Sequence, residues 1–378
     1  MYEKNYNRPN NHQERVATII SPPDIPLLII IACLAMVGLM AVFSSSISHG
    51  IQDFNDHLYF FKKQLLNFTI GFFCMVYFIK FNYKKFQQKI NLLTMGTIGL
   101  LIATHLFGST IYGSKRWLFF CQPSEFAKFT CVAIMADALV HSKTLWDEYF
   151  LKRVFSVLII LILIMLQPDL GTTIVVFLGC LATCIIGGIS MQLLSTGFMG
   201  FTALAVFSIM NMPHQRERID GWLNPWADQY DKGYNLIQSW YAISAGGFWG
   251  TGFGNSKQKL LWLPLGHIDF IFAIFAEEMG FLGCLILLGL FLGIMHRGFL
   301  ISKRCPEEFG KLLAFGITCV ILAQALLNIC VAVGILPVTG VTLPLVSYGG
   351  TSAIVTMSMF GILLNISRQK IKRIKTNV

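Results

Sequence analysis

Apolar runs about as long as a lipid bilayer is thick recur along almost the whole chain. Of its 378 residues, 55% are hydrophobic and only 13% are charged, whereas a soluble domain carries about 25% charged residues. A helix of roughly 20 apolar residues spans a bilayer, and a helix satisfies its own backbone groups there. The sequence therefore predicts an all-α polytopic membrane protein of about ten transmembrane helices. We expect the helices near residues 25–46, 65–79, 90–107, 123–140, 154–166, 170–188, 193–210, 269–295, 311–336 and 349–366.

The chain divides into one membrane domain and two tails. Residues 1–24 are polar without hydrophobic period and are expected to form a loose tail. The transmembrane domain spans 25–366, with a long extracytoplasmic loop at 211–268 between helices 7 and 8. A basic tail, 367–378, follows. We expect no soluble domain, so any chemistry must be built from membrane helices and their loops.

The net charge of +10 is distributed as in a membrane protein. With the N-terminus inside, 19 of the 29 Lys and Arg residues fall on the cytoplasmic side of the expected spans. This positive-inside bias predicts that both termini are cytoplasmic, and it argues against nucleic-acid binding. The ten Cys residues show no CxxC or metal-ligand spacing, so neither a disulfide framework nor a zinc site is expected.

The long outer loop holds five of the seven Trp residues, a residue type that prefers the headgroup layer. Within this loop, 234–245 has the character of an interfacial amphipathic helix, and 246–256 is Gly-rich enough to pack its backbone closely against another segment. The loop also carries cations, which suit either a pyrophosphate or anionic lipid headgroups. These cations are Arg216, Arg218, Lys257 and Lys259.

Asp269 stands where this loop re-enters the membrane, at the expected start of the eighth helix. It fits a helix N-cap, or a general base whose basicity is raised by burial and whose charge is kept by a nearby cation. Lys128 is the candidate cation. It lies three residues after Glu125 in an expected helix, so it either pairs with Glu125 or faces a polar cavity and another carboxylate.

Two outer turns and a pair of deeper carboxylates are the remaining polar features of the expected membrane domain. Asp169 precedes a helix and fits an N-cap or the lining of a polar entrance. Residues 336–352 interrupt hydrophobic sequence with two Pro and three Gly, which predicts a re-entrant wall lining a site. Glu277 and Glu278, two turns deeper than Asp269, fit structural pairs or a deeper cavity.

Several segments together resemble one known family, the SEDS proteins (shape, elongation, division, sporulation), and the resemblance covers about 113–368. The GNSKQK and NPWAD segments look more like the division member FtsW than the elongation member RodA, and a sporulation member would look similar. The segments are QPSEFAK, QPDLGTT, ERIDGWLNPWADQYDKGYNLIQS, GGFWGTGFGNSKQK, LPLGHIDFIFAIFAEE and LPVTGVTLPLVSYGG.

The resemblance implies a peptidoglycan glycosyltransferase that polymerises lipid II at the outer face of the bacterial cytoplasmic membrane, at the division septum. The family's essential Asp falls on Asp269, and the Lys proposed to pair with it falls on Lys128. The expected substrate-binding residues are Arg116, Glu125, Arg218, Gln238, Gln258, Lys259 and Ser347. The expected partners are lipid II, a cognate class B penicillin-binding protein, other division proteins and membrane lipids.

One residue departs from the family pattern, and one property of the family has no counterpart in the sequence. The family commonly has Glu where this chain has Leu265, which leaves the role of that Glu open here. The family is also reported to need a divalent cation such as Mg or Mn, for which the sequence shows no ligand set.

Two other functions fit part of the pattern. Charged residues within a bundle and interrupted helices also suit a lipid II flippase. A flippase needs polar groups in both leaflets, however, whereas Lys128, Asp169 and Asp269 gather on the outer side. The third function is a non-catalytic division scaffold, which would tolerate the loss of Asp269.

Overall fold

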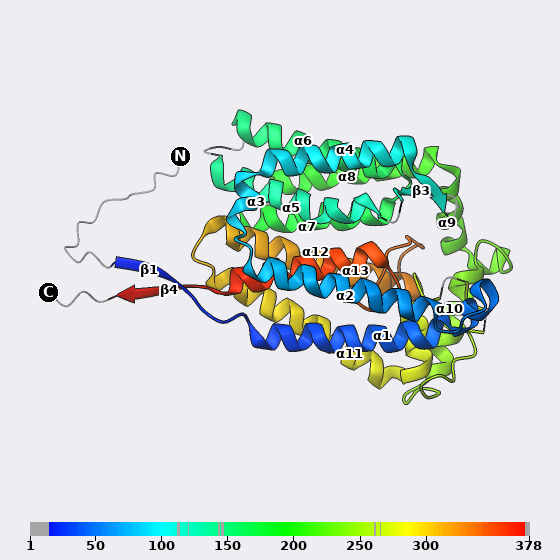
Figure 1. The fold of residues 1–378 in the computed structure, drawn as a ribbon. Coiled ribbons are helices and arrows are strands. Elements are labelled where there is room, and N and C mark those ends of the chain that lie inside the picture. Colours follow the sequence, from blue (N-terminus) through cyan, green and yellow to red (C-terminus); the bar gives the residue numbers. More distant parts are fainter. Residues whose placement is uncertain are drawn as a thin grey trace.

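The computed structural model describes residues 15–374, except 112, 113, 120, 143, 145, 146, 261 and 265. In this part of the chain, long helices run side by side in one bundle (Figure 1). Seven of them are long and apolar enough to cross a membrane, and α2, α5 and α7 run beside them. An all-α polytopic membrane protein is therefore confirmed. The long helices are α1 (Ile25–Phe54), α2 (Tyr59–Lys80), α4 (Ile90–Phe107), α5 (Pro123–His141), α6 (Glu148–Leu166), α7 (Leu170–Ile186), α8 (Met191–Asn211), α11 (Ile271–Arg304), α12 (Glu308–Val333) and α13 (Gly350–Ser367).

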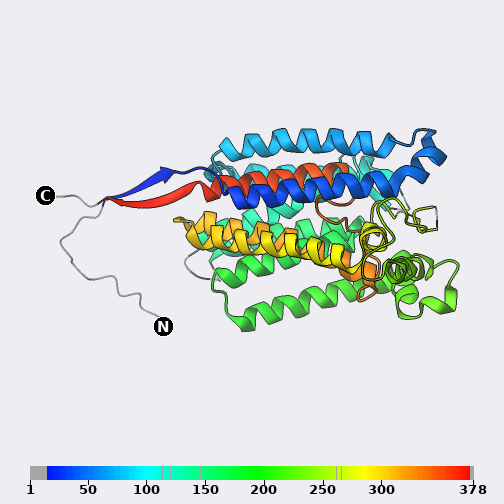
Figure 2. The same cartoon turned by 90° about the horizontal axis from the view of Figure 1, so that it is seen from below.

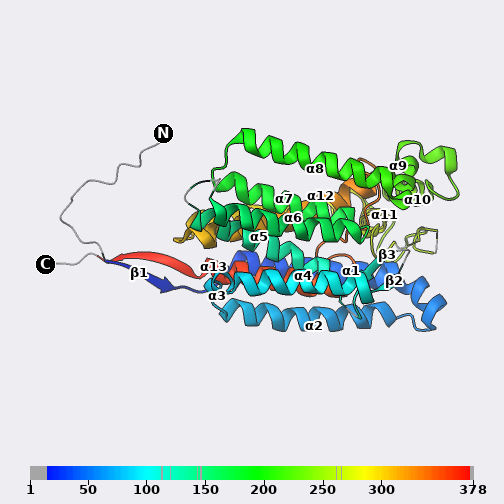
Figure 3. The same ribbon diagram turned by 90° about the horizontal axis from the view of Figure 1, so that it is seen from above.

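Shorter elements cap both ends of the bundle. The helices among them are α3 (Lys84–Gln88), α9 (Pro213–Leu223), the 3-10 helix η1 (Pro225–Asp228) and α10 (Tyr234–Gly246). The strands are β1 (Arg15–Ile20), β2 (Ser109–Ile111), β3 (Ser114–Trp117) and β4 (Gln369–Ile374). We call the end with α9, α10, β2 and β3 the loop end; β1 and β4 leave from the opposite, terminal end (Figures 1 and 3).

The two ends of the described chain are joined in an antiparallel ribbon. Strand β1 pairs with β4, so that Arg15 lies opposite Ile374 and Ile20 opposite Gln369. The ribbon projects away from the helices (Figure 2). The expectation of a loose tail over 1–24 therefore does not hold for 15–20, where the β-branched run VATII favours a strand.

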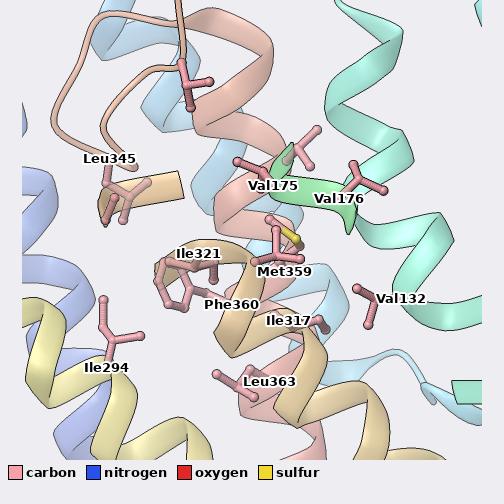
Figure 4. Close-up of a cluster of buried hydrophobic side chains, with 14 of the residues drawn as sticks. Val132, Val175, Val176, Ile294, Ile317, Ile321, Leu345, Met359, Phe360 and Leu363 are labelled. Atoms are coloured by element: carbon pink, nitrogen blue, oxygen red, sulfur yellow. The ribbon is translucent and has the colours of Figure 1, made fainter. Parts of the chain in front are cut away.

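The hydrophobic core lies where α12 and α13 pass through the middle of the bundle. Side chains from α5, α7 and α11 pack onto these two helices (Figure 4). By contrast, α8 buries only Leu194 and Ser208 and lies at the periphery. The core residues labelled in Figure 4 are Val132, Val175, Val176, Ile294, Ile317, Ile321, Leu345, Met359, Phe360 and Leu363.

The Gly-rich segment 246–256 packs its backbone into a break in α11, which confirms the expected close approach. The break is at Gly280, whose φ of 65° and ψ of −169° suit essentially only glycine. The break frees backbone groups that the Gly-rich segment then satisfies. The bonds run from Thr251 N to Glu277 O (2.9 Å), from Gly252 N to Glu278 O (3.0 Å) and from Phe281 N to Gly247 O (2.9 Å).

A Gly280→Ala substitution is expected to destabilise the protein by at least about 1–3 kcal/mol. The left-handed backbone strains any side chain there, and a β-carbon would lie 2.3 Å from Gly250 N. A Gly96→Ala change in α4 is the matched control, because nothing lies within 4 Å of its β-carbon. Thermal unfolding in detergent should show a lower midpoint for Gly280→Ala alone. Equal midpoints for the two variants would contradict the role given to the break.

Candidate active site

Asp269 lies in the turn that leads into α11, at the loop end of the bundle. The helix begins at Ile271, two residues later than the sequence suggested, and its N-cap is Phe270, which makes no side-chain cap bond. Asp269 therefore does not cap α11. Its carboxylate instead points toward the irregular segment between α12 and α13, at Gly340.

Three charged groups converge on Gly340, which has a positive φ of 74°. A β-carbon added there would lie 3.6 Å from Arg116 Nη1, 3.7 Å from Asp269 Oδ2 and 3.9 Å from Arg218 Nη1. We call these four residues the Gly340 cluster. The irregular backbone expected over 336–352 thus does form part of the wall of a polar site.

Each arginine of the cluster is held by backbone carbonyls. Arg116, in β3, donates from Nε to Gln167 O at 3.3 Å and from Nη2 to Pro168 O. Arg218, in α9, donates from Nη1 to Val338 O at 3.3 Å. A guanidinium has five N–H donors, so these described contacts use only part of each group's capacity. The remaining donors suit an anion such as a phosphate.

Asp169 forms an ion pair with Arg116 and caps a neighbouring helix. Its carboxylate caps α7 by accepting from Thr172 N at 3.2 Å, as expected. It also accepts from Gln122 and Ser124, both at 3.3 Å. Arg116 Nη1 lies 3.6 Å from Asp169 Oδ1. Asp169 therefore ties α5, α7 and β3 together at the edge of the cluster.

Burial makes Asp269 a stronger base than an ordinary carboxylate. Burial raises the pKa of Asp269 to about 6, and Asp169 adds to the rise, while Arg218 and Arg116 oppose it. The carboxylate is thus mainly ionised near pH 7 and still basic enough to accept a proton. Burial and Arg116 in turn lower the pKa of Arg218.

Lys128 does not form the expected direct pair with Asp269. Its buried ammonium donates to Glu125 Oε1 at 2.7 Å and to Gln324 Oε1 at 2.8 Å. Glu125 lies one helical turn earlier and therefore forms an ion pair with Lys128 within the same helix. Among the described residues, the charges acting on Asp269 are those of Arg218, Arg116 and Asp169.

Lys259 lies in a different buried cluster, so the structure does not bring it to Asp269. It donates to Glu278 at 3.0 Å and to Ser44 of α1 at 2.9 Å. The backbone N–H of Gln258 approaches Glu277 at 3.4 Å. Glu277 thus pairs with residues 256–258, and Glu278 pairs with Lys259 and Ser44, so both carboxylates make the structural pairs that were one of the two alternatives open from the sequence.

For two other expected substrate-binding residues, the described contacts do not include the charged groups of the Gly340 cluster. Ser347 Oγ accepts from Leu343 N at 2.8 Å, and its carbonyl accepts from Gln64 of α2 at 3.2 Å. Ser347 thus shapes the irregular segment. Gln238 is partly buried on α10. Leu265, the main departure from the family pattern, lies outside the described residues.

Sequence reasoning missed Gly340, Gln324 and Asn328. Asn328 Nδ2 donates to Asp269 O at 2.8 Å and to Val341 O at 2.7 Å. The available signal was two carboxamides one turn apart in an otherwise apolar helix, which in a membrane marks an interhelical contact.

The described residues contain no group of three or more His, Cys, Asp or Glu side chains that could hold a metal ion. The described chain therefore offers the divalent cation implied by the family resemblance no set of three or more such ligands.

Comparison with known proteins places this chain in a family. The model of the FtsW/RodA/SpoVE family, described as cell cycle proteins, matches residues 25–372. The chain belongs to this family. The SEDS resemblance drawn from the sequence motifs is thereby confirmed.

Two members of the family are similar to this chain over nearly their whole length. The chain is 36% identical to stage V sporulation protein E of Bacillus subtilis, over 92% of this chain and 97% of that protein. It is 33% identical to a probable peptidoglycan glycosyltransferase FtsW of Geobacter sulfurreducens, over 91% and 95%.

Solved structures of the family share the fold. A chain of a structure described as showing coordination of polymerization and crosslinking by a peptidoglycan synthase complex aligns with a TM-score of 0.74 at 27% identity, over 92% of this chain and 98% of that one. The rod shape determining protein RodA of Thermus thermophilus aligns with a TM-score of 0.69 at 25% identity, over 92% and 97%.

Proposed function

We propose that this chain is a peptidoglycan glycosyltransferase that polymerises lipid II into glycan strands, for cell-wall synthesis at the division septum. The observation that carries the proposal is the Gly340 cluster, in which one carboxylate of raised basicity lies near two guanidiniums. Relatives named as probable peptidoglycan glycosyltransferases support this activity.

In the proposed reaction Asp269 is the general base. It takes the proton from the 4-hydroxyl of the acceptor GlcNAc while that oxygen attacks C1 of the donor MurNAc. The bond from C1 to the pyrophosphate oxygen breaks, C1 inverts, and undecaprenyl pyrophosphate leaves. The proton ends on Asp269, which returns it to water before the next cycle.

Arg116 and Arg218 are proposed to bind the pyrophosphate of the donor. Two guanidiniums near one point suit an anion with several oxygens, because each can donate two parallel hydrogen bonds. As the glycosidic bond forms, negative charge grows on the leaving pyrophosphate, and preorganised cations stabilise it. This role falls to these two arginines rather than to Lys259, which Glu278 already holds.

The proposed orientation puts the Gly340 cluster outside the cell. The bias of Lys and Arg toward the terminal end supports the proposal that both termini lie in the cytoplasm. Because Arg116 and Arg218 belong to β3 and α9 at the loop end, the site then faces the outer leaflet (Figure 1). We place the protein in the bacterial cytoplasmic membrane, with membrane lipids around it.

The proposed partner is a cognate class B penicillin-binding protein, which would crosslink the strands that this chain makes, alongside other division proteins. The proposal is supported by the similar chain from the peptidoglycan synthase complex, whose description couples polymerization to crosslinking.

Reconstitution separates the three candidate functions. The purified chain, its penicillin-binding partner, lipid II and a divalent cation should together give glycan strands, with a partner blocked in its transpeptidase site as a control for crosslinking. No strands, with lipid II crossing the vesicle membrane, would instead indicate a flippase. Neither product, with a normal complex between the two proteins, would indicate a scaffold.

A further inference from the structure

We propose that Lys128 is a positioning residue, which acts through Gln324 and Asn328 to hold Asp269 and Gly340 in register. In this role Lys128 transfers no proton to or from Asp269 and forms no direct ion pair with it. The inference rests on the proposed function for its kinetic test, but its structural basis stands on hydrogen bonds alone.

Gln324 and Asn328 form a two-step ladder on one face of α12. They are four residues apart, hence one above the other on the helix, and only 1% of each is exposed. Gln324 Nε2 donates to Thr342 O at 2.9 Å, and Asn328 Nδ2 donates to Val341 O at 2.7 Å. The two carboxamides thus hold consecutive carbonyls of the irregular segment, directly after Gly340.

Asn328 joins this segment to the turn that carries the proposed base. The same Nδ2 also donates to Asp269 O at 2.8 Å. One buried amide therefore fixes the backbone of Asp269 relative to that of Val341, and so sets where the carboxylate stands beside Gly340. Such buried, irregular backbone needs donors of this kind, because a buried carbonyl without a hydrogen-bond partner costs free energy.

Lys128 decides which way the Gln324 amide points. An ammonium only donates, so the Gln324 oxygen must face Lys128, at 2.8 Å, and the NH₂ group must face Thr342. Without Lys128 only the carbonyl of Thr342 favours this orientation, because the hydroxyls of Thr342 and Ser352 near Nε2 can accept from it or donate to a flipped oxygen. A flipped amide would turn its oxygen toward the carbonyl of Thr342. The hydrogen bond that holds the irregular segment at Thr342 would then be lost.

The charge of Lys128 is already balanced where it stands. Glu125 accepts from Lys128 at 2.7 Å, so the pair exerts little net field at Asp269. The charged groups that face Asp269 are Arg116 of β3, Arg218 of α9 and Asp169 before α7. A direct electrostatic role and a positioning role therefore predict different pH profiles.

The kinetic test uses a double variant, Glu125→Gln with Lys128→Met, which leaves no unpaired buried charge. We expect kcat to fall by about 100-fold, the effect of a roughly 1 Å misplacement, while the acidic limb of the pH–rate profile stays where it is. A limb displaced to higher pH would overturn the inference, since it would show that Lys128 acts on the charge of Asp269.

A second variant keeps the inference testable if the first does not fold. Gln324→Leu should give a similar loss of kcat with an unmoved limb. Adding it to the Glu125/Lys128 pair should cost little more, because residues of one hydrogen-bonded unit are not additive. Fully additive losses would contradict the ladder.

A structural readout separates this inference from the proposed function. Hydrogen–deuterium exchange of the backbone amides at 338–343 should be faster in both variants than in the wild type, whether or not the wild type makes glycan strands. Unchanged exchange in well-folded variants would overturn the ladder. Faster exchange in variants of a protein that makes no strands would leave the ladder standing and refute only the glycosyltransferase.

Discussion

Replacing Asp269 by Asn should lower the rate of strand formation by about 1,000-fold, the usual effect of removing a general base. Asn has the same size and retains the backbone carbonyl that Asn328 holds, so the fold should persist while the proton acceptor is lost. Initial rates with lipid II, together with the thermal unfolding midpoint, measure the two effects separately.

The matched control for this change is Asp53→Asn. Asp53 is exposed in the last turns of α1, so the same chemical change there should leave the rate unchanged. An Asp269→Asn variant that polymerises lipid II as fast as Asp53→Asn would remove Asp269 from the mechanism.

An Arg218→Gln variant should be about 100-fold slower, and its activity should fail at a higher pH than that of the wild type. Arg218 opposes the rise in the pKa of Asp269, so its removal lets that pKa climb above about 6. The base works only when ionised, hence activity is lost as pH falls through this raised pKa. Rates measured across pH test both parts.

The neighbouring Arg216→Gln variant is the control, because Arg216 lies on the same helix and is exposed. It changes the net charge of the loop equally without touching the Gly340 cluster. If both arginine variants had the same small effect, Arg218 would be acting only as part of a general positive surface.

Local pattern sufficed to predict most of the architecture. Apolar runs located the long helices, Pro123 and Asp169 marked two helix starts, and the glycines of 246–256 indicated a close backbone approach. These signals work because each depends on residues near one another in the chain. The strand β1 was missed because its pairing partner, β4, lies at the opposite end of the sequence.

The site was predicted in part. Asp269, Arg116 and Arg218 were named and do meet, but the expected Lys128–Asp269 pair does not form. The short spacing of Glu125 and Lys128 allowed a local pair, which is the alternative that the structure adopts. Gln324, which takes the other bond of Lys128, is 196 residues away. No local pattern brings such distant groups together, nor shows that the three charged groups lie around Gly340.

The most direct test of the account is the rate of strand formation from lipid II between about pH 5 and about pH 8, for the wild type and for Asp269→Asn. The wild-type rate should fall as pH drops through about 6, where Asp269 takes up a proton. The Asp269→Asn rate should be about 1,000-fold lower and should lack this limb. The same limb in both proteins, at similar rates, would contradict Asp269 as the base.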